Sequence, residues 1–105
     1  MPMKLPPRPN NIEKRRTITS ITGRKVHFVV ADEIVIPQGP GKLIYFQKLK
    51  FEKDNRIEYR FAYYMIGHKP SRRGRWVFGQ YCLMIPQREL ALLLRKARAH
   101  GWRGI

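Results

Sequence analysis

Acidic side chains are scarce in this chain. Only 7 of its 105 residues are Asp or Glu, against 22 Lys and Arg, so the formal charge is +15 and the pI is about 10.8. So few carboxylates argue against catalysis by paired acids and against a basic substrate. Such a charge on a small chain is normally tolerated because something anionic binds it. Nucleic acid is therefore the first candidate partner, and an anionic membrane surface is the second.

Cysteine, metal ligands and long apolar runs are also scarce. Cys82 is the only cysteine, which excludes an internal disulfide and favours a reducing compartment. We expect a cytoplasmic protein, with nucleoid association or a nuclear location as the alternatives. One cysteine and three scattered histidines give no zinc-ligand spacing, and no P-loop is present, so we expect no metal and no cofactor. No stretch approaches the roughly 18 apolar residues that cross a bilayer, and the proline-rich start is unlike a signal peptide. We expect no membrane partner.

The length allows one domain with one modest core. Residues 1–16 are predicted to form a basic, proline-rich N-terminal arm, because Pro2, Pro6, Pro7 and Pro9 block helix formation and strand pairing. The arm is either solvated or in contact with phosphates. Residues 17–105 are predicted to form a single β-rich domain with a C-terminal helix.

Alternating apolar and polar residues predict several strands. They are expected at residues 17–22, 25–31, 34–36, 42–53, 56–66 and 75–85. Asp54 and Asn55 separate two alternating runs and have the chemistry of a hairpin turn. The run 75–85 is apolar on both faces, which predicts a central strand, and its Cys82 is expected to be a buried, inert thiol.

A helix is predicted at residues 86–100, because Pro86 suits its first position and an apolar stripe follows. The stripe consists of Leu90, Leu93, Leu94 and Ala97. Gly101 suits the position after the helix, from which Trp102 can pack back onto it. The predicted fold class is α+β: an antiparallel β-meander of about five strands followed by one C-terminal helix. One helix covers one face of a sheet, so the other face needs the N-terminal strands or a second subunit, and we expect a homodimer.

The loop at residues 67–75 is the first candidate site. It carries His68, Lys69, Arg72, Arg73 and Arg75 and no acid. Guanidinium groups on a loop between strands can bind phosphates in a bidentate manner. The alternative interpretation is a solvated, charged loop.

The outer face of the hairpin at residues 42–66 is the second candidate site. The core-facing residues are predicted to be Leu43, Tyr45, Leu49 and Phe51 on one strand, and Ile57, Tyr59, Phe61, Tyr63 and Met65 on the other. The outer face is predicted to interleave cations with aromatic rings, namely Lys48, Lys50 and Arg60 with Phe46 and Tyr64. Cations that follow a backbone, beside rings on which bases stack, are typical of single-strand binding. The alternative is that these rings pack against the helix or a dimer partner.

A resemblance to a known family covers residues 57–97. A strand ends in Tyr63-Tyr64, a basic loop contains Lys69-Pro70 and Arg72-Arg73-Gly74, and a strand then leads into a helix with Leu90, Leu93 and Leu94. This run resembles the positive-cofactor-four family of transcriptional coactivators. The resemblance implies a curved antiparallel four-stranded sheet followed by a helix, a dimer, and binding of single-stranded or melted DNA. The N-terminal half departs from it by at least one extra strand, and residues 76–80 have no counterpart.

Three functions follow from these patterns. The leading hypothesis is a nucleic-acid-binding module without catalysis, for single-stranded or distorted DNA, or RNA. The second is a small nuclease such as an RNase toxin, in which His68 is the general acid or base and the loop arginines stabilise charge. The third is an accessory subunit whose basic face contacts an acidic protein or a larger nucleoprotein.

Overall fold

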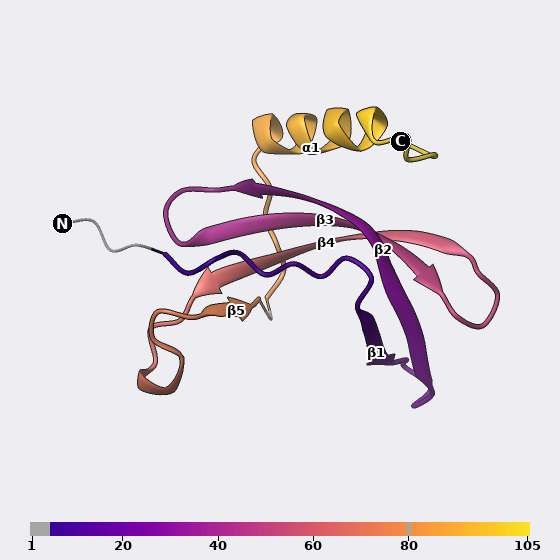
Figure 1. The fold of residues 1–105 in the computed structure, drawn as a ribbon, viewed down its shortest axis with the longest axis horizontal. Helices are drawn as coiled ribbons and strands as arrows, with labels where there is room; N and C mark the ends of the chain where they lie inside the picture. The colour runs from indigo at the N-terminus through magenta and orange to yellow at the C-terminus, as the bar shows by residue number, and fades with distance from the viewer. Residues whose placement is uncertain (1–4, 80) are drawn as a thin grey trace.

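The computed structural model of the chain describes residues 5–79 and 81–105, so residues 1–4 of the predicted arm and Gln80 lie outside the described residues. Five strands form one antiparallel sheet in chain order, followed by one helix (Figure 1). The elements are β1 (Arg15–Thr19), β2 (Lys25–Pro37), β3 (Lys42–Phe51), β4 (Ile57–Ile66), β5 (Trp76–Phe78) and α1 (Gln87–Ala99). The predicted α+β meander with a C-terminal helix is confirmed.

The β3–β4 hairpin forms where the sequence predicts it. Asn55 adopts the left-handed conformation at φ 59°, and its N–H donates to the carbonyl of Phe51 at 2.9 Å. Asn tolerates this conformation better than most residues, which explains why the chain reverses here. β1 begins at Arg15 and ends at Thr19, so it lies earlier in the chain than the predicted run 17–22.

A β-bulge in β2 changes which face its side chains point to. The predicted runs 25–31 and 34–36 form one strand, whose register against β3 shifts between Val30 and Asp32. An extra residue in one strand reverses the alternation beyond it. Phe28 and Val30 therefore belong to one face of the sheet, whereas Ile34 and Ile36 belong to the other. This reversal divides the buried residues into two clusters.

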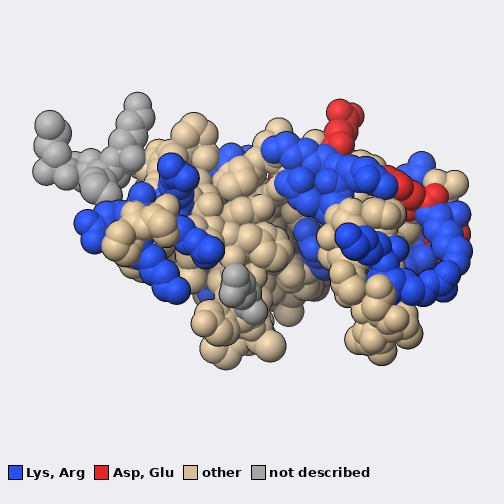
Figure 2. Space-filling model, turned by 90° about the horizontal axis from the view of Figure 1, so that it is seen from below, with Lys and Arg blue, Asp and Glu red and all other residues tan. Residues whose placement is uncertain are grey.

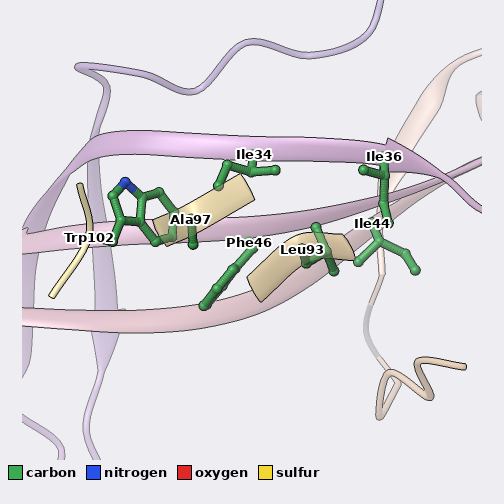
Figure 3. Packing of buried hydrophobic residues seen from close by; sticks show 7 residues of the cluster. All are labelled: Ile34, Ile36, Ile44, Phe46, Leu93, Ala97 and Trp102. Atoms are coloured by element: carbon green, nitrogen blue, oxygen red, sulfur yellow. The ribbon is translucent and has the colours of Figure 1, made fainter. Parts of the chain in front are cut away.

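The larger cluster lies between the sheet and α1. Figure 3 shows its seven side chains, Ile34, Ile36, Ile44, Phe46, Leu93, Ala97 and Trp102, gathered between the strands and the helix. Trp102 reaches this cluster because Gly101 adopts φ +81° and the Trp102 N–H donates to the Ala97 carbonyl at 3.0 Å. This is the bond of a Schellman motif, and the predicted return of Trp102 onto the helix is confirmed.

The N-terminal arm crosses the face of the sheet that α1 leaves open. The Tyr45 hydroxyl, which points away from the helix side, donates to the carbonyl of Pro9, and Trp76 Nε1 donates to that of Pro6 at 2.9 Å. The arm is the indigo segment that runs along the strands in Figure 1. The expectation of a second subunit rests on an uncovered face of the sheet, and the arm covers part of that face.

The predicted central strand at residues 75–85 is wrong. β5 is a three-residue edge strand, and after Phe78 the chain leaves the sheet toward α1 (Figure 1). Only Leu83 and Ile85 of the segment 81–86 pack against the helix-side cluster. Cys82 is exposed, so the prediction of a buried thiol is also wrong.

Candidate functional site

The expected outer face of the hairpin is split between the two sides of the sheet. In the register of β3 and β4, Phe46 pairs with Phe61, and Gln47 pairs with Arg60. Directly opposite residues share a face, and successive residues of a strand alternate between faces. Phe46, Lys48 and Lys50 therefore lie on the helix side, whereas Arg60 and Tyr64 lie on the side of the arm. The prediction that these five residues share one surface is wrong.

Neither predicted stacking ring is open to a base. Phe46 is 3% exposed, and its ring centroid lies 4.2 Å from that of Phe61 and 5.0 Å from that of Trp102. Tyr64 is half-buried beneath the arm, where its hydroxyl donates to Asn11 Oδ1 at 3.3 Å. Both rings are therefore packed inside the fold. Phe46 packs on the helix side, as the alternative interpretation has it, whereas Tyr64 packs against the arm.

Arg60 is held within a polar network. Its Nε donates to Gln47 Oε1 at 2.7 Å, and its guanidinium carbon lies 5.1 Å from the ring centroid of Phe28. Burial lowers the pKa of Arg60, although a guanidinium keeps its charge in proteins. Arg60 therefore supports the sheet rather than presenting a free cation. Lys48 is half-buried and Lys50 is exposed, both on the helix side.

The loop between β4 and β5 keeps its predicted cations together. Its backbone is fixed by a 3-10 turn, η1 (Pro70–Arg72), by the N–H of Gly67 donating to the Arg75 carbonyl at 2.9 Å, and by a bridge between Gly67 and Arg73. The charged side chains it exposes are Lys69, Arg72, Arg73 and Arg75, together with His68. Within residues 5–79 and 81–105, the ion pairs involve Arg15, Arg56 and His100 and none of these loop cations.

A second group of cations occupies the opposite end of the molecule. Figure 2 shows Lys and Arg gathered in two groups along the long axis, and the acidic side chains visible in this view lie with only one of them. At that end, Arg15 pairs with Glu52, and Arg56 pairs with both Asp54 and Glu58. Nearby Arg24, Lys25 and Lys53 line a hollow of about 550 Å³. The loop end differs because its positive charge is not neutralised by pairing in the described chain.

A cavity of about 310 Å³ opens beside the loop. Its floor is formed by the buried Tyr63 with Met65, Val77 and Tyr81, and its rim carries His68, Lys69 and Arg72. Phe78 also borders the cavity, but its ring packs against Tyr64 on the arm side of the sheet. No local pattern in the sequence predicts this cavity, because it needs β4, the loop, β5 and Tyr81 in one place. The basic residues of the loop indicate the charged rim of the cavity. The apolar run after Arg75 predicts a buried strand, and so gives no sign of the cavity floor.

Two glycines shape the cavity. A Cβ on Gly79 would overlap the ring of Tyr63, and one on Gly67 would overlap the backbone of Arg72. The chain therefore passes over Tyr63 only because residue 79 has no side chain. The Tyr63 hydroxyl also accepts the Tyr81 N–H at 3.0 Å, which fixes where Tyr81 begins to project.

The described lining of the cavity offers cations and apolar side chains that can bind a ligand, and one imidazole, that of His68. Its described lining contains no carboxylate, and in the described part of the chain no three His, Cys, Asp or Glu residues are grouped as a metal site. None of the helices in residues 5–79 and 81–105 is long and apolar enough to span a bilayer. Comparison with protein-family models, curated proteins and solved structures finds no match to this chain. The resemblance to the positive-cofactor-four family therefore stays a prediction from the sequence.

Proposed function

We propose that the protein binds single-stranded nucleic acid, DNA or RNA, without cleaving it. The observation that carries this proposal is the loop at residues 67–75, which exposes four cations that have no acidic partner among the described residues. Clustered Lys and Arg release counterions when they neutralise phosphates, and this supplies most of the affinity of such proteins. The backbone of this loop is already fixed by its own hydrogen bonds. Binding therefore loses less conformational entropy than it would if the loop had to become ordered first.

An exposed aromatic ring beside the loop favours a single strand over a duplex. Tyr81 is 84% exposed and lines the cavity together with Lys69 and Arg72. Bases that are free of a duplex can stack on such a ring, whereas paired bases cannot reach it. Tyr81 thus takes the role predicted from the sequence for Phe46 and Tyr64, while the loop cations keep theirs.

A retardation assay tests the proposal. Labelled single-stranded DNA, duplex DNA and RNA of equal length are each mixed with the protein at several salt concentrations. We expect tighter binding of the single strands and intact nucleic acid after incubation. If about five phosphates are neutralised, log Kobs on a single strand should fall with log salt with a slope of about −3.5. A slope near zero would contradict binding through phosphates.

The nuclease function is the second candidate, because His68 lies on the rim of the cavity. A nuclease needs a second proton-transfer group, and the described lining offers tyrosines but no carboxylate. We expect the His68→Ala variant to bind nearly as the wild type does, because the four exposed cations of the loop remain to contact phosphates. Cleavage of RNA by the wild type without added metal, lost in His68→Ala, would establish the nuclease instead.

We also propose that the protein forms a homodimer. Its support is the apolar surface of Ile57 and Phe61, which lie on the same face of β4 and are 42% and 38% exposed. Apolar side chains grouped on one surface are typical of a subunit interface. Light scattering at high micromolar concentration should give the mass of two chains. The mass of one chain at that concentration would overturn the dimer and leave the binding function untouched.

A further inference from the structure

We propose that the cavity beside the loop holds one unstacked nucleotide of the bound strand. Its base would stack on Tyr81, beside the apolar side chains of Met65 and Val77, and its phosphate would lie on Lys69 and Arg72. This inference rests on the proposed function and adds to it a defined site for a single nucleotide. Phosphate contacts along the loop alone would need no such cavity.

The size of the cavity suits one nucleotide. Its volume of about 310 Å³ is at the small end of ligand pockets, which range from roughly 300 to 1,000 Å³. A run of stacked bases needs an open groove, whereas a cavity bounded by β4, β5 and the loop leaves room for one base. The neighbouring nucleotides would remain outside, where Arg73 and Arg75 are exposed on the same loop.

The lining has the two chemistries that a nucleotide needs. The Tyr81 ring, which is 84% exposed, can stack against the face of any base, which gives affinity without sequence preference. The guanidinium of Arg72 and the ammonium of Lys69 stand at the rim and can bind a phosphate that remains close to water. No carboxylate in the described lining would repel that phosphate. An uncharged apolar ligand would leave these cations without a role, and a cationic ligand would be repelled by them.

The walls of the cavity are already in place without a ligand. The Gly79 backbone packs directly on the Tyr63 ring, and the Tyr81 N–H is bonded to the Tyr63 hydroxyl at 3.0 Å. The Gly79 N–H also donates to the Tyr63 carbonyl at 2.8 Å. Because both bonds end on Tyr63, its ring and the start of Tyr81 have a fixed relation. Because the backbone of Tyr81 is already fixed, less entropy is lost when a base binds to its ring.

The test compares an intact strand with a strand that has no bases. Affinity is measured for oligothymidylate and for an abasic oligomer of the same length and charge, at one salt concentration. Stacking of a base on an aromatic side chain contributes about 1–3 kcal/mol, so the intact strand should bind about 5- to 150-fold more tightly. In the Tyr81→Ala variant this preference should fall toward unity. Tyr81 is 84% exposed, so its removal should leave the fold intact, which circular dichroism checks.

Arg73→Ala is the matched control, because Arg73 lies on the same loop but outside the cavity lining. It should weaken binding of both strands equally and keep the preference for bases. Arg72→Ala should weaken binding of both strands and also reduce the preference, because the phosphate would no longer hold the base in place.

The outcomes separate this inference from the proposed function. Equal affinity of the wild type for the intact and abasic strands would overturn the nucleotide site but leave binding through phosphates standing. No binding of either strand would overturn the proposed function itself. Thymidine monophosphate is added as a competitor: binding of the free nucleotide without any binding of the strand would also overturn the inference, because the site would then serve a small molecule.

Discussion

Asn11 donates both its backbone N–H and its side-chain amide to the carboxylate of Glu33, at 2.9 and 3.3 Å. Both residues are buried, Asn11 in the arm and Glu33 in β2. Gln47 donates to the same carboxylate at 2.9 Å, and Arg16 donates to Asn11 Oδ1 at 3.0 Å. A buried carboxylate is tolerated only when such donors satisfy it, so the sheet needs the arm in this position.

Removing the Asn11 side chain should therefore loosen the arm. Asn11→Ala deletes the amide that meets Glu33 and the oxygen that accepts from Arg16 and Tyr64. We expect the free energy of unfolding to fall by about 1–3 kcal/mol, the cost of leaving buried polar groups unsatisfied. Urea denaturation measures it. Lys14→Ala, at an exposed position of the same arm, is the control and should change stability by less than about 0.5 kcal/mol. Equal effects of the two variants would show that the arm is not fastened through Asn11.

The helix should depend on one leucine. Leu93 is fully buried among residues of β2 and β3 and the returning Trp102. Truncation to alanine leaves a cavity that the sheet cannot fill, so Leu93→Ala should cost about 2–5 kcal/mol in unfolding experiments. Met84→Ala, at a side chain that is 83% exposed, is the control and should be nearly neutral. A loss below about 1 kcal/mol at Leu93 would mean that α1 contributes little to the core.

Stability in acid should depend on Asp32, at the bulge of β2. Its Oδ2 accepts from Trp102 Nε1 at 2.8 Å and is 2.9 Å from His100 Nδ1. Burial alone would raise the pKa of Asp32, but hydrogen bonds from His100, from Trp102 and from the Glu33 N–H outweigh it and hold the pKa below its ordinary value. A depressed pKa in the folded state contributes stability that is present above the unfolded pKa of about 4 and is lost as the pH falls through the folded pKa.

The test is a series of denaturation curves between about pH 6 and pH 2.5, which brackets the ordinary pKa of Asp. We expect the unfolding free energy of the wild type to fall toward acid more steeply than that of Asp32→Asn, which has no carboxylate to protonate. Glu13→Gln, on an exposed residue of the arm, should follow the wild-type curve. Parallel acid limbs for the wild type and Asp32→Asn would contradict a stabilising charge at this position.

The loop arginines should set the salt dependence of binding. Replacing Arg72 and Arg73 together by alanine removes two exposed cations from the loop. On a single strand each lost phosphate contact reduces the slope of log Kobs against log salt by about 0.7, so the slope should become shallower by about 1.4. Arg95→Ala with Lys96→Ala removes the same charge from the exposed side of α1 and should change the slope little. Equal changes in both double variants would mean that the whole charge, rather than the loop, determines binding.

Local patterns in the sequence determined the elements of this protein. The alternation on either side of Asp54-Asn55 predicts the β3–β4 hairpin, because turn-forming residues and a period of two are short-range properties. The apolar stripe through Leu93 and Ala97, ending at Gly101, likewise predicts α1 and the return of Trp102. The charge of the loop at residues 67–75 is also visible in the sequence, since the loop contains no acid.

The tertiary structure alone decided which side chains face which neighbours. The bulge after Val30 reverses the faces of β2, and the register of β3 against β4 places Phe46 and Arg60 on opposite sides of the sheet. Faces depend on pairing between distant segments, and one extra residue inverts every side chain beyond it, so alternation within one strand cannot fix them. The close passage of Gly79 over Tyr63 is of the same kind, because it joins β4 to the chain that leaves β5. That contact, rather than any local pattern, turns an apolar run into the floor of a cavity beside the basic loop.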